Sequence, residues 1–184
     1  RVQMPSTDRL WLSFAALGLL FARAGAWPLG MLGLSRALSA LEGEASPLTT
    51  WLSAGLARSA LAIFVGMSLI GLCRVDGIGQ THFRWPRKAT ASVARHLRWY
   101  TPVIAAFTFV IVGARAVGGS DTMAMVRVLA LVALTISAAF FGLLLRPRGP
   151  LMGHVSDNSL WRVWRAVWPL MYVLVIGSFL SLAA

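Results

Sequence analysis

The sequence predicts an all-α, polytopic membrane protein, and three observations lead to this fold class. Hydrophobic residues make up 58% of the 184 residues and charged residues only 12%, whereas about a quarter of an ordinary soluble domain is charged. The apolar residues stand in long blocks and do not alternate with polar ones, as they would around a soluble core. Polar residues gather in short stretches between those blocks. Lipid is therefore the expected surrounding for most of the chain.

A helix needs about 20 mostly apolar residues to cross the hydrocarbon core of a bilayer. Five segments meet or nearly meet this requirement, and the first of them could continue toward Leu41. We expect them to form a single transmembrane domain over residues 1–184, as a fragment of a larger chain. The predicted spans are residues 10–34, 48–73, 99–117, 122–145 and 164–184.

The positions of Lys and Arg predict which side of the membrane each loop faces. Ten cations fall after the second and fourth spans, and none falls in the turns at 42–47 and 118–121. Cytoplasmic loops carry an excess of Lys and Arg, so the N-terminus is expected in the cytoplasm and the C-terminus in the periplasm. The ten cations are Arg74, Arg84, Arg87, Lys88, Arg95, Arg98, Arg146, Arg148, Arg162 and Arg165.

Residues 86–98 combine four cations with apolar residues in a pattern typical of an amphipathic helix. Pro86 suits the first turn of such a helix. We expect a short basic helix that lies on the inner membrane surface before the span at 99–117 and binds anionic lipid head groups. A solvated loop that serves only topology is the alternative, and both interpretations stay open. The candidate lipid-contacting or gating residues of this region are Arg87, Lys88, Arg95, Arg98, Trp85 and Trp99.

Arg23 and Arg58 fall inside the first and second predicted spans. A charge within a span is costly and by default marks a functional site. All the acidic residues lie in loops or near span ends, so this sequence offers no ion pair inside the membrane. Both arginines are candidates for gating or lipid contact, with a structural role as the alternative. The six acidic residues are Asp8, Glu42, Glu44, Asp76, Asp121 and Asp157.

Small residues recur at a spacing of four in the second predicted span. Gly55 and Ser59 form one such pair, and Ala62 and Gly66 form another. This spacing is typical of helices whose backbones approach closely in a membrane. It indicates a packed helix pair that includes the second span.

The sequence shows no pattern of a catalytic, cofactor or metal site. Cys73 is the only cysteine, and the three histidines are scattered among loops without ligand partners. Hydrolase and phosphate-binding motifs are absent. The net charge of +11 fits loops that face anionic lipid better than a nucleic-acid surface. We predict no enzyme activity, no cofactor and no nucleic-acid partner.

Three short motifs carry a resemblance to a known family. They are GIGQTHFRWP at 77–86, RPRGPL at 146–151 with WRVWRAVWPL at 161–170, and AWPL at 26–29. In their order and spacing they resemble the large MscS-like mechanosensitive channels of the MscK (KefA) and MscM type. The resemblance implies a set of outer, tension-sensing helices in a homo-oligomer, a heptamer, of the bacterial inner membrane. Such channels release ions and osmolytes on hypo-osmotic shock.

Two other functions stay open from the sequence. A small secondary transporter or transporter membrane subunit would need broken helices and polar groups at mid-membrane, and Pro28 is the only candidate break. A membrane enzyme acting on lipid would need a cluster of His, Asp or Ser near one interface. Neither pattern is present in the sequence as strongly as the channel resemblance.

Overall fold

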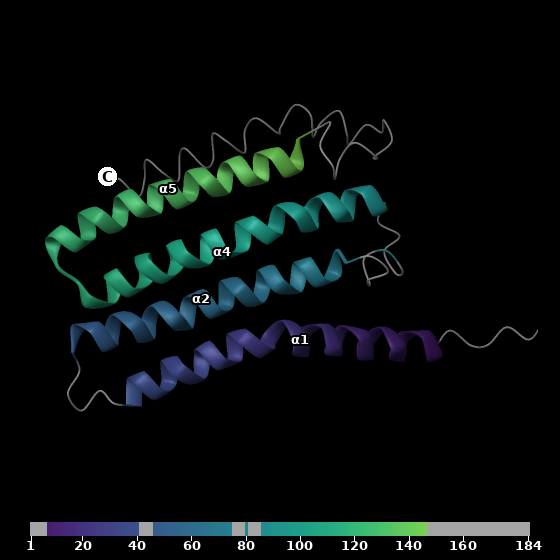
Figure 1. Cartoon of the computed structure of the whole chain (residues 1–184), viewed down its shortest axis with the longest axis horizontal. Helices are drawn as coiled ribbons and strands as arrows, with labels where there is room; N and C mark the ends of the chain where they lie inside the picture. The colour runs from purple at the N-terminus through teal and green to yellow at the C-terminus, as the bar shows by residue number, and fades with distance from the viewer. Residues whose placement is uncertain (1–6, 41–45, 75–79, 81–85, 147–184) are drawn as a thin grey trace, which may run out of the picture.

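The computed structural model describes residues 7–40, 46–74, 80 and 86–146, and these form four long helices (Figure 1). The helices are α1 (Thr7–Ala40), α2 (Pro47–Leu72), α4 (Arg87–Val117) and α5 (Ser120–Leu145). Each contains a stretch long and apolar enough to cross a membrane. The all-α prediction and the first four predicted spans are therefore confirmed. The fifth predicted span, 164–184, lies outside the described residues.

The ends of α2 follow from local sequence. The Ser46 side chain accepts a hydrogen bond from the Thr49 backbone N–H at 3.3 Å, which satisfies one of the unpaired donors of a helix start. Pro47 takes the first helical position, where its missing N–H costs nothing. The helix ends at Leu72 and Cys73 caps it. This matches the predicted span of 48–73 closely.

Helix α4 corrects one prediction about the basic segment. Residues 86–98 do not form a separate helix on the membrane surface, because α4 runs without interruption from Arg87 through Val117. Its 31 residues extend about 46 Å at 1.5 Å per residue, beyond a hydrocarbon core of about 30 Å. Pro102 lies inside α4 but leaves the helix continuous. Packing of the first turns of α4 against α2 and α5 keeps the basic segment in line with the rest of the helix.

The four helices form one layer in which each helix packs against its neighbours along the chain (Figure 1). Successive helices run antiparallel, and the Gly118–Gly119 turn joins α4 to α5. Both glycines have positive φ values, 78° and 102°, a region that residues with a Cβ rarely adopt. Helix α1 bends along its length in Figure 1 and contains Pro28, whose ring and missing N–H disturb the helical hydrogen bonds.

This arrangement places the N-terminal end of α1, the C-terminal end of α2, the N-terminal end of α4 and the C-terminal end of α5 at one end of the layer. We call it the basic end, because six exposed cations of the described residues lie there. They are Arg74, Arg87, Lys88, Arg95, Arg98 and Arg146. The opposite end holds Arg36, Arg115, Arg127 and Asp121.

Candidate functional site at the basic end of the helix layer

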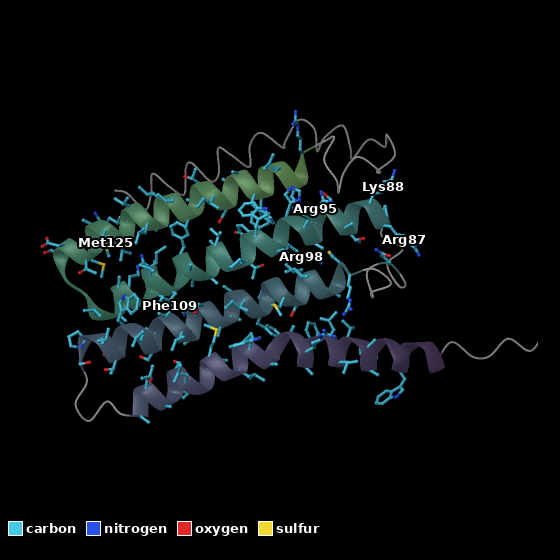
Figure 2. The ribbon with its side chains drawn as sticks, in the orientation of Figure 1. Arg87, Lys88, Arg95, Arg98, Phe109 and Met125 are labelled. Carbon is cyan, nitrogen blue, oxygen red and sulfur yellow. The ribbon has the colours of Figure 1, made fainter. Side chains whose placement is uncertain are left out.

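The first turns of α4 divide into a charged face and a buried face. Lys88, Arg95 and Arg98 are exposed, together with Arg87 at the helix start, and we call these four residues the basic face (Figure 2). Residues on the other side of the same turns are buried. They are Ala89, Thr90, Val93, Ala94 and Leu97. The predicted two-sided character is therefore present, although it belongs to the base of a long helix.

The buried face explains why the segment continues the helix instead of turning along the membrane. Val93, Ala94 and Leu97 form one apolar cluster with Cys73, which caps α2, and with Phe140 and Leu144 of α5. Thr90 accepts a hydrogen bond from the Gln80 Nε2 at 2.7 Å. A helix on the membrane surface would lose all these contacts with α2 and α5. The buried residues of these turns thus hold the basic face in place on the helix layer.

Helices α4 and α5 meet near the basic end through a cluster of aromatic rings that we call the aromatic seam: Trp99, Tyr100, Phe140 and Phe141. Tyr100 and Phe140 stack with centroids 3.9 Å apart and planes 11° apart, and Trp99 meets Phe140 edge-on at 5.9 Å. The Tyr100 hydroxyl donates a hydrogen bond to Ser137 Oγ at 2.9 Å. Phe140 is 2% exposed. Rings of this size hold the two helix axes apart while filling the space between them.

Trp99 joins this seam to the exposed surface of α4. Its side chain is 44% exposed, and it follows Arg98 directly on α4. A Trp ring half in contact with protein and half open is typical of the head-group level of a membrane. The other candidate tryptophan, Trp85, lies outside the described residues.

Helices α2 and α4 meet through glycines, at contacts that we call the glycine seam: Gly55, Gly66 and Gly113. A Cβ added at Gly55 would lie 2.8 Å from the Phe109 carbonyl oxygen, and one at Gly113 would lie 2.7 Å from the Trp51 carbonyl oxygen. At Gly66 the added Cβ would overlap the Thr101 side chain. The backbones therefore approach as closely as the absence of side chains allows.

The predicted packed pair of the second span is confirmed, with two of its four small residues in this seam. Gly55 and Gly66 belong to it, Ser59 is also buried, and Ala62 is half-buried. The Ser59 hydroxyl donates to the Gly55 carbonyl of its own helix at 2.8 Å. The spacing of small residues in α2 therefore predicted a close helix contact. The sequence did not indicate that Gly113 and Thr101 of α4 form the other side of that contact.

Helices α1 and α2 pack together through buried serines, a hydrogen bond and apolar side chains. The Ser35 hydroxyl donates to the Ser53 backbone carbonyl at 2.8 Å, and both serines are buried. Phe21 and Phe64 meet with centroids 6.0 Å apart. The Leu20 side chain packs over Gly71. These contacts place Arg23 alongside the C-terminal half of α2.

Arg23 and Arg58 do not come together and both are exposed. Arg23 lies one turn beyond Leu20, level with the stretch of α2 between Phe64 and Gly71, and Arg58 lies close to the middle of α2. An arginine at the centre of a membrane helix costs about 2.5–3.5 kcal/mol on insertion scales. None of the six carboxylates of the chain falls in the interior of a described helix.

Other chemistry finds no support within the described ranges. No three His, Cys, Asp or Glu side chains gather there as metal ligands. His96, the one histidine among them, has its Nδ1 at 2.8 Å from the Ser92 carbonyl oxygen. Cys73 is buried within the apolar cluster, which makes it a packing residue.

The aromatic seam and the Thr101 contact are features that sequence reasoning missed. No sequence pattern pairs Tyr100 with the span at 122–145, and no periodicity in that span singles out Phe140. A signal was nevertheless present, since Tyr100 and Ser137 are polar groups within apolar spans and such groups tend to pair. Tyr100 and Ser137 are 37 positions apart in the sequence. They meet because α4 and α5 pack side by side in antiparallel directions.

Comparison with known protein families identifies a match. A family model described as the mechanosensitive ion channel inner membrane domain 1 matches residues 1–183, which is nearly the whole chain. No curated protein and no solved structure matches.

Proposed function

The chain belongs to the family of mechanosensitive ion channel inner membrane domains, and on that premise we propose that it forms the tension-sensing helices of an MscS-type channel. Membership makes it a multi-pass inner membrane protein of a channel family, which is not a family of enzymes. The match over residues 1–183 is the observation that carries the proposal. We further propose the MscK or MscM subtype, a heptameric assembly, and release of ions and osmolytes on hypo-osmotic shock.

The physical mechanism needs no ligand. Membrane tension favours whichever conformation occupies more area, as a ligand favours the state to which it binds better. Large apolar side chains are exposed on each of the four helices, among them Leu19, Leu61, Trp99 and Val128. A layer of this kind offers a wide contact with lipid, so a change in its tilt or spread changes the area of the whole channel.

The basic face supplies a point at which lipid acts on the layer. Each Lys or Arg near an anionic membrane surface contributes about 1 kcal/mol of attraction. Arg87, Lys88, Arg95 and Arg98 together would hold the base of α4 to the inner head groups with several kcal/mol. Because the back of the same turns packs on α2 and α5, a force on the head groups reaches three helices.

The test is to replace the four cations of the basic face with Gln in the full-length protein. Membrane patches are then recorded under graded suction. We expect the opening threshold to shift while the conductance is unchanged, because a sensor alters gating and leaves the pore alone. A matched control replaces Arg115 and Arg127, exposed cations at the opposite end, and should shift the threshold less. An unchanged threshold in correctly inserted protein would refute the coupling.

The orientation of the layer is part of the proposal. We place the basic end in the cytoplasm, because Lys and Arg predominate in cytoplasmic loops. Single cysteines replacing Asp121 or Glu44, in a Cys73→Ser background, should react with an impermeant thiol reagent from the periplasmic side. Cysteines replacing Lys88 or Arg148 should not. The reverse labelling pattern would overturn this orientation.

The transporter alternative has less support. It requires helices broken at mid-membrane, whereas α2, α4 and α5 each run continuously through their described spans. Pro28 lies inside α1, where it removes a backbone hydrogen bond, but the helix still continues from Thr7 to Ala40. No observation in the described part of the chain favours a transported substrate.

A further inference from the structure

One face of α2 carries a cation and a row of exposed apolar side chains. Leu61, Val65 and Leu69 follow Arg58 at positions that share one side of a helix. Their side chains are 55%, 49% and 42% exposed, and Arg58 is exposed as well. We call these four residues the Arg58 face. It differs from the sides of α2 that pack on α1 and α4, where Gly55, Ser59 and Ala60 are buried.

The depth of Arg58 prevents its charge from reaching water along the helix. Along α2 it lies about 17 Å from Pro47 and about 21 Å from Leu72, in a hydrocarbon core about 30 Å thick. Long cationic side chains escape the core by extending to the interface only from near the helix ends. The guanidinium of Arg58 therefore needs a polar partner at mid-bilayer.

Arg23 shows the contrast within the same layer. Leu20, one turn before it, packs over Gly71 at the basic end of α2. Helical side chains lean toward the N-terminus of their helix, which for α1 is the basic end. Arg23 can thus extend to the head groups. Of these two arginines, Arg58 lies too deep to reach them.

This sequence does not supply the partner as a carboxylate. Asp8 and Asp121 are the second residues of α1 and α5, and Asp76 follows the end of α2. Glu42, Glu44 and Asp157 fall between or after the described helices. A second copy of the layer would place its carboxylates at the same positions. A carboxylate at mid-bilayer must therefore come from a segment other than these helices.

We propose that the Arg58 face docks against a transmembrane helix that lies outside residues 7–146 and carries an Asp or Glu at mid-bilayer. The guanidinium is suited to bind both oxygens of a carboxylate, and Leu61, Val65 and Leu69 supply the apolar contact around the pair. This interface goes beyond the proposed function, since it holds whether or not the layer responds to tension. It would tie the outer layer to another part of an assembled channel.

The experiment uses the full-length protein in native membranes. A photoreactive benzophenone amino acid replaces Leu61 or Val65, and the adducts formed on illumination are mapped by mass spectrometry. We expect an adduct with a membrane helix that contains Asp or Glu near the labelled position. Arg58→Leu should lower the yield several-fold, whereas Arg58→Lys should retain most of it. Once the carboxylate is identified, reversing both charges should restore an adduct that Arg58→Glu alone abolishes.

The controls separate docking from folding and from gating. Arg58→Leu removes a charge from the membrane core and so favours insertion, which membrane fractionation verifies. A probe replacing Val128 of α5, 59% exposed, should give the same adducts with and without Arg58. Adducts with lipid alone, or with residues 7–146 of a second copy, would overturn the proposal. Suction thresholds recorded on the same variants test the tension-sensing role separately, because an interface can form in a channel that does not sense tension through this layer.

Discussion

Among the described helices, α4 packs mainly against α2 and α5, and its contacts with them are built in different ways. Against α2 it presents Gly113 and Thr101 to the Trp51 backbone and to Gly66, so that main chains and short side chains touch. One edge-on ring pair, Trp51 with Phe109 at 4.7 Å between centroids, lies beside these contacts. Against α5 it presents Trp99 and Tyr100 to Phe140 and Phe141, so that rings touch rings. In the glycine seam the backbones of α2 and α4 approach each other closely, whereas in the aromatic seam side chains separate the backbones of α4 and α5.

The difference matters because the two seams respond differently to displacement. At Gly55 and Gly113 the facing atom is a backbone carbonyl oxygen, which cannot rotate away as a side chain can, so these contacts leave little room to absorb a shift. Aromatic side chains can change rotamer, and the α4–α5 turn contains Gly118 and Gly119, which accept many backbone conformations. We therefore expect α2 and α4 to move as one body and α5 to be the element that reorients. The predictions that follow test this contrast.

The largest effect is expected in the glycine seam. Gly55→Ala and Gly113→Ala each place a Cβ against a backbone carbonyl oxygen, and overpacking of this kind typically costs about 1–3 kcal/mol. The midpoint of unfolding in mixed detergent micelles should fall for each variant. The control is Gly30→Ala or Gly33→Ala, where nothing lies within 4 Å. There, loss of a helical glycine should stabilise by roughly 0.5–1 kcal/mol. Equal behaviour at all four positions would show that the close approach is not real.

A smaller effect is expected in the aromatic seam. Phe140→Leu keeps an apolar side chain but removes the ring contacts with Trp99 and Tyr100, which are worth about 0.5–1.5 kcal/mol beyond burial. The same unfolding assay should show this loss, and patch recordings should show a lower opening threshold if α5 is the element that reorients. Phe14→Leu, at a position 66% exposed on α1, serves as the control. A loss at Phe140 as large as at Gly113 would remove the contrast between the seams.

The smallest effect concerns the hydrogen bond between Tyr100 and Ser137. Tyr100→Phe deletes only the hydroxyl, and interhelical hydrogen bonds in membranes average about 0.6 kcal/mol. Ser137 also donates to the Ala133 carbonyl at 2.8 Å, so it keeps a partner. A double-mutant cycle with Ser137→Ala should return a coupling energy of that size. A coupling energy of zero would mean that the stacked rings alone position Tyr100.

The sequence by itself determined the solvent, the number of membrane spans over residues 7–146, and the bounds of α2 and α5 to within two residues. It did not determine the start of α4 at Arg87. Long apolar blocks separated by turn residues leave no alternative to membrane helices, because lipid offers no hydrogen bonds to an unpaired backbone. Local chemistry also set the start of α2 at Ser46 and Pro47. The two-sided pattern around Arg95 predicted the basic face, and small residues four apart predicted that α2 packs closely.

Only the tertiary structure decided what those surfaces touch. The basic segment had the composition of a surface helix, and contacts of Val93 and Leu97 with Cys73, Phe140 and Leu144 made it the base of α4. Likewise Gly66 meets Thr101, and Tyr100 meets Phe140, across separations that no local pattern encodes. Period and composition report which face of a helix is buried. Which neighbour buries it depends on how antiparallel helices register, and that is a property of the whole layer.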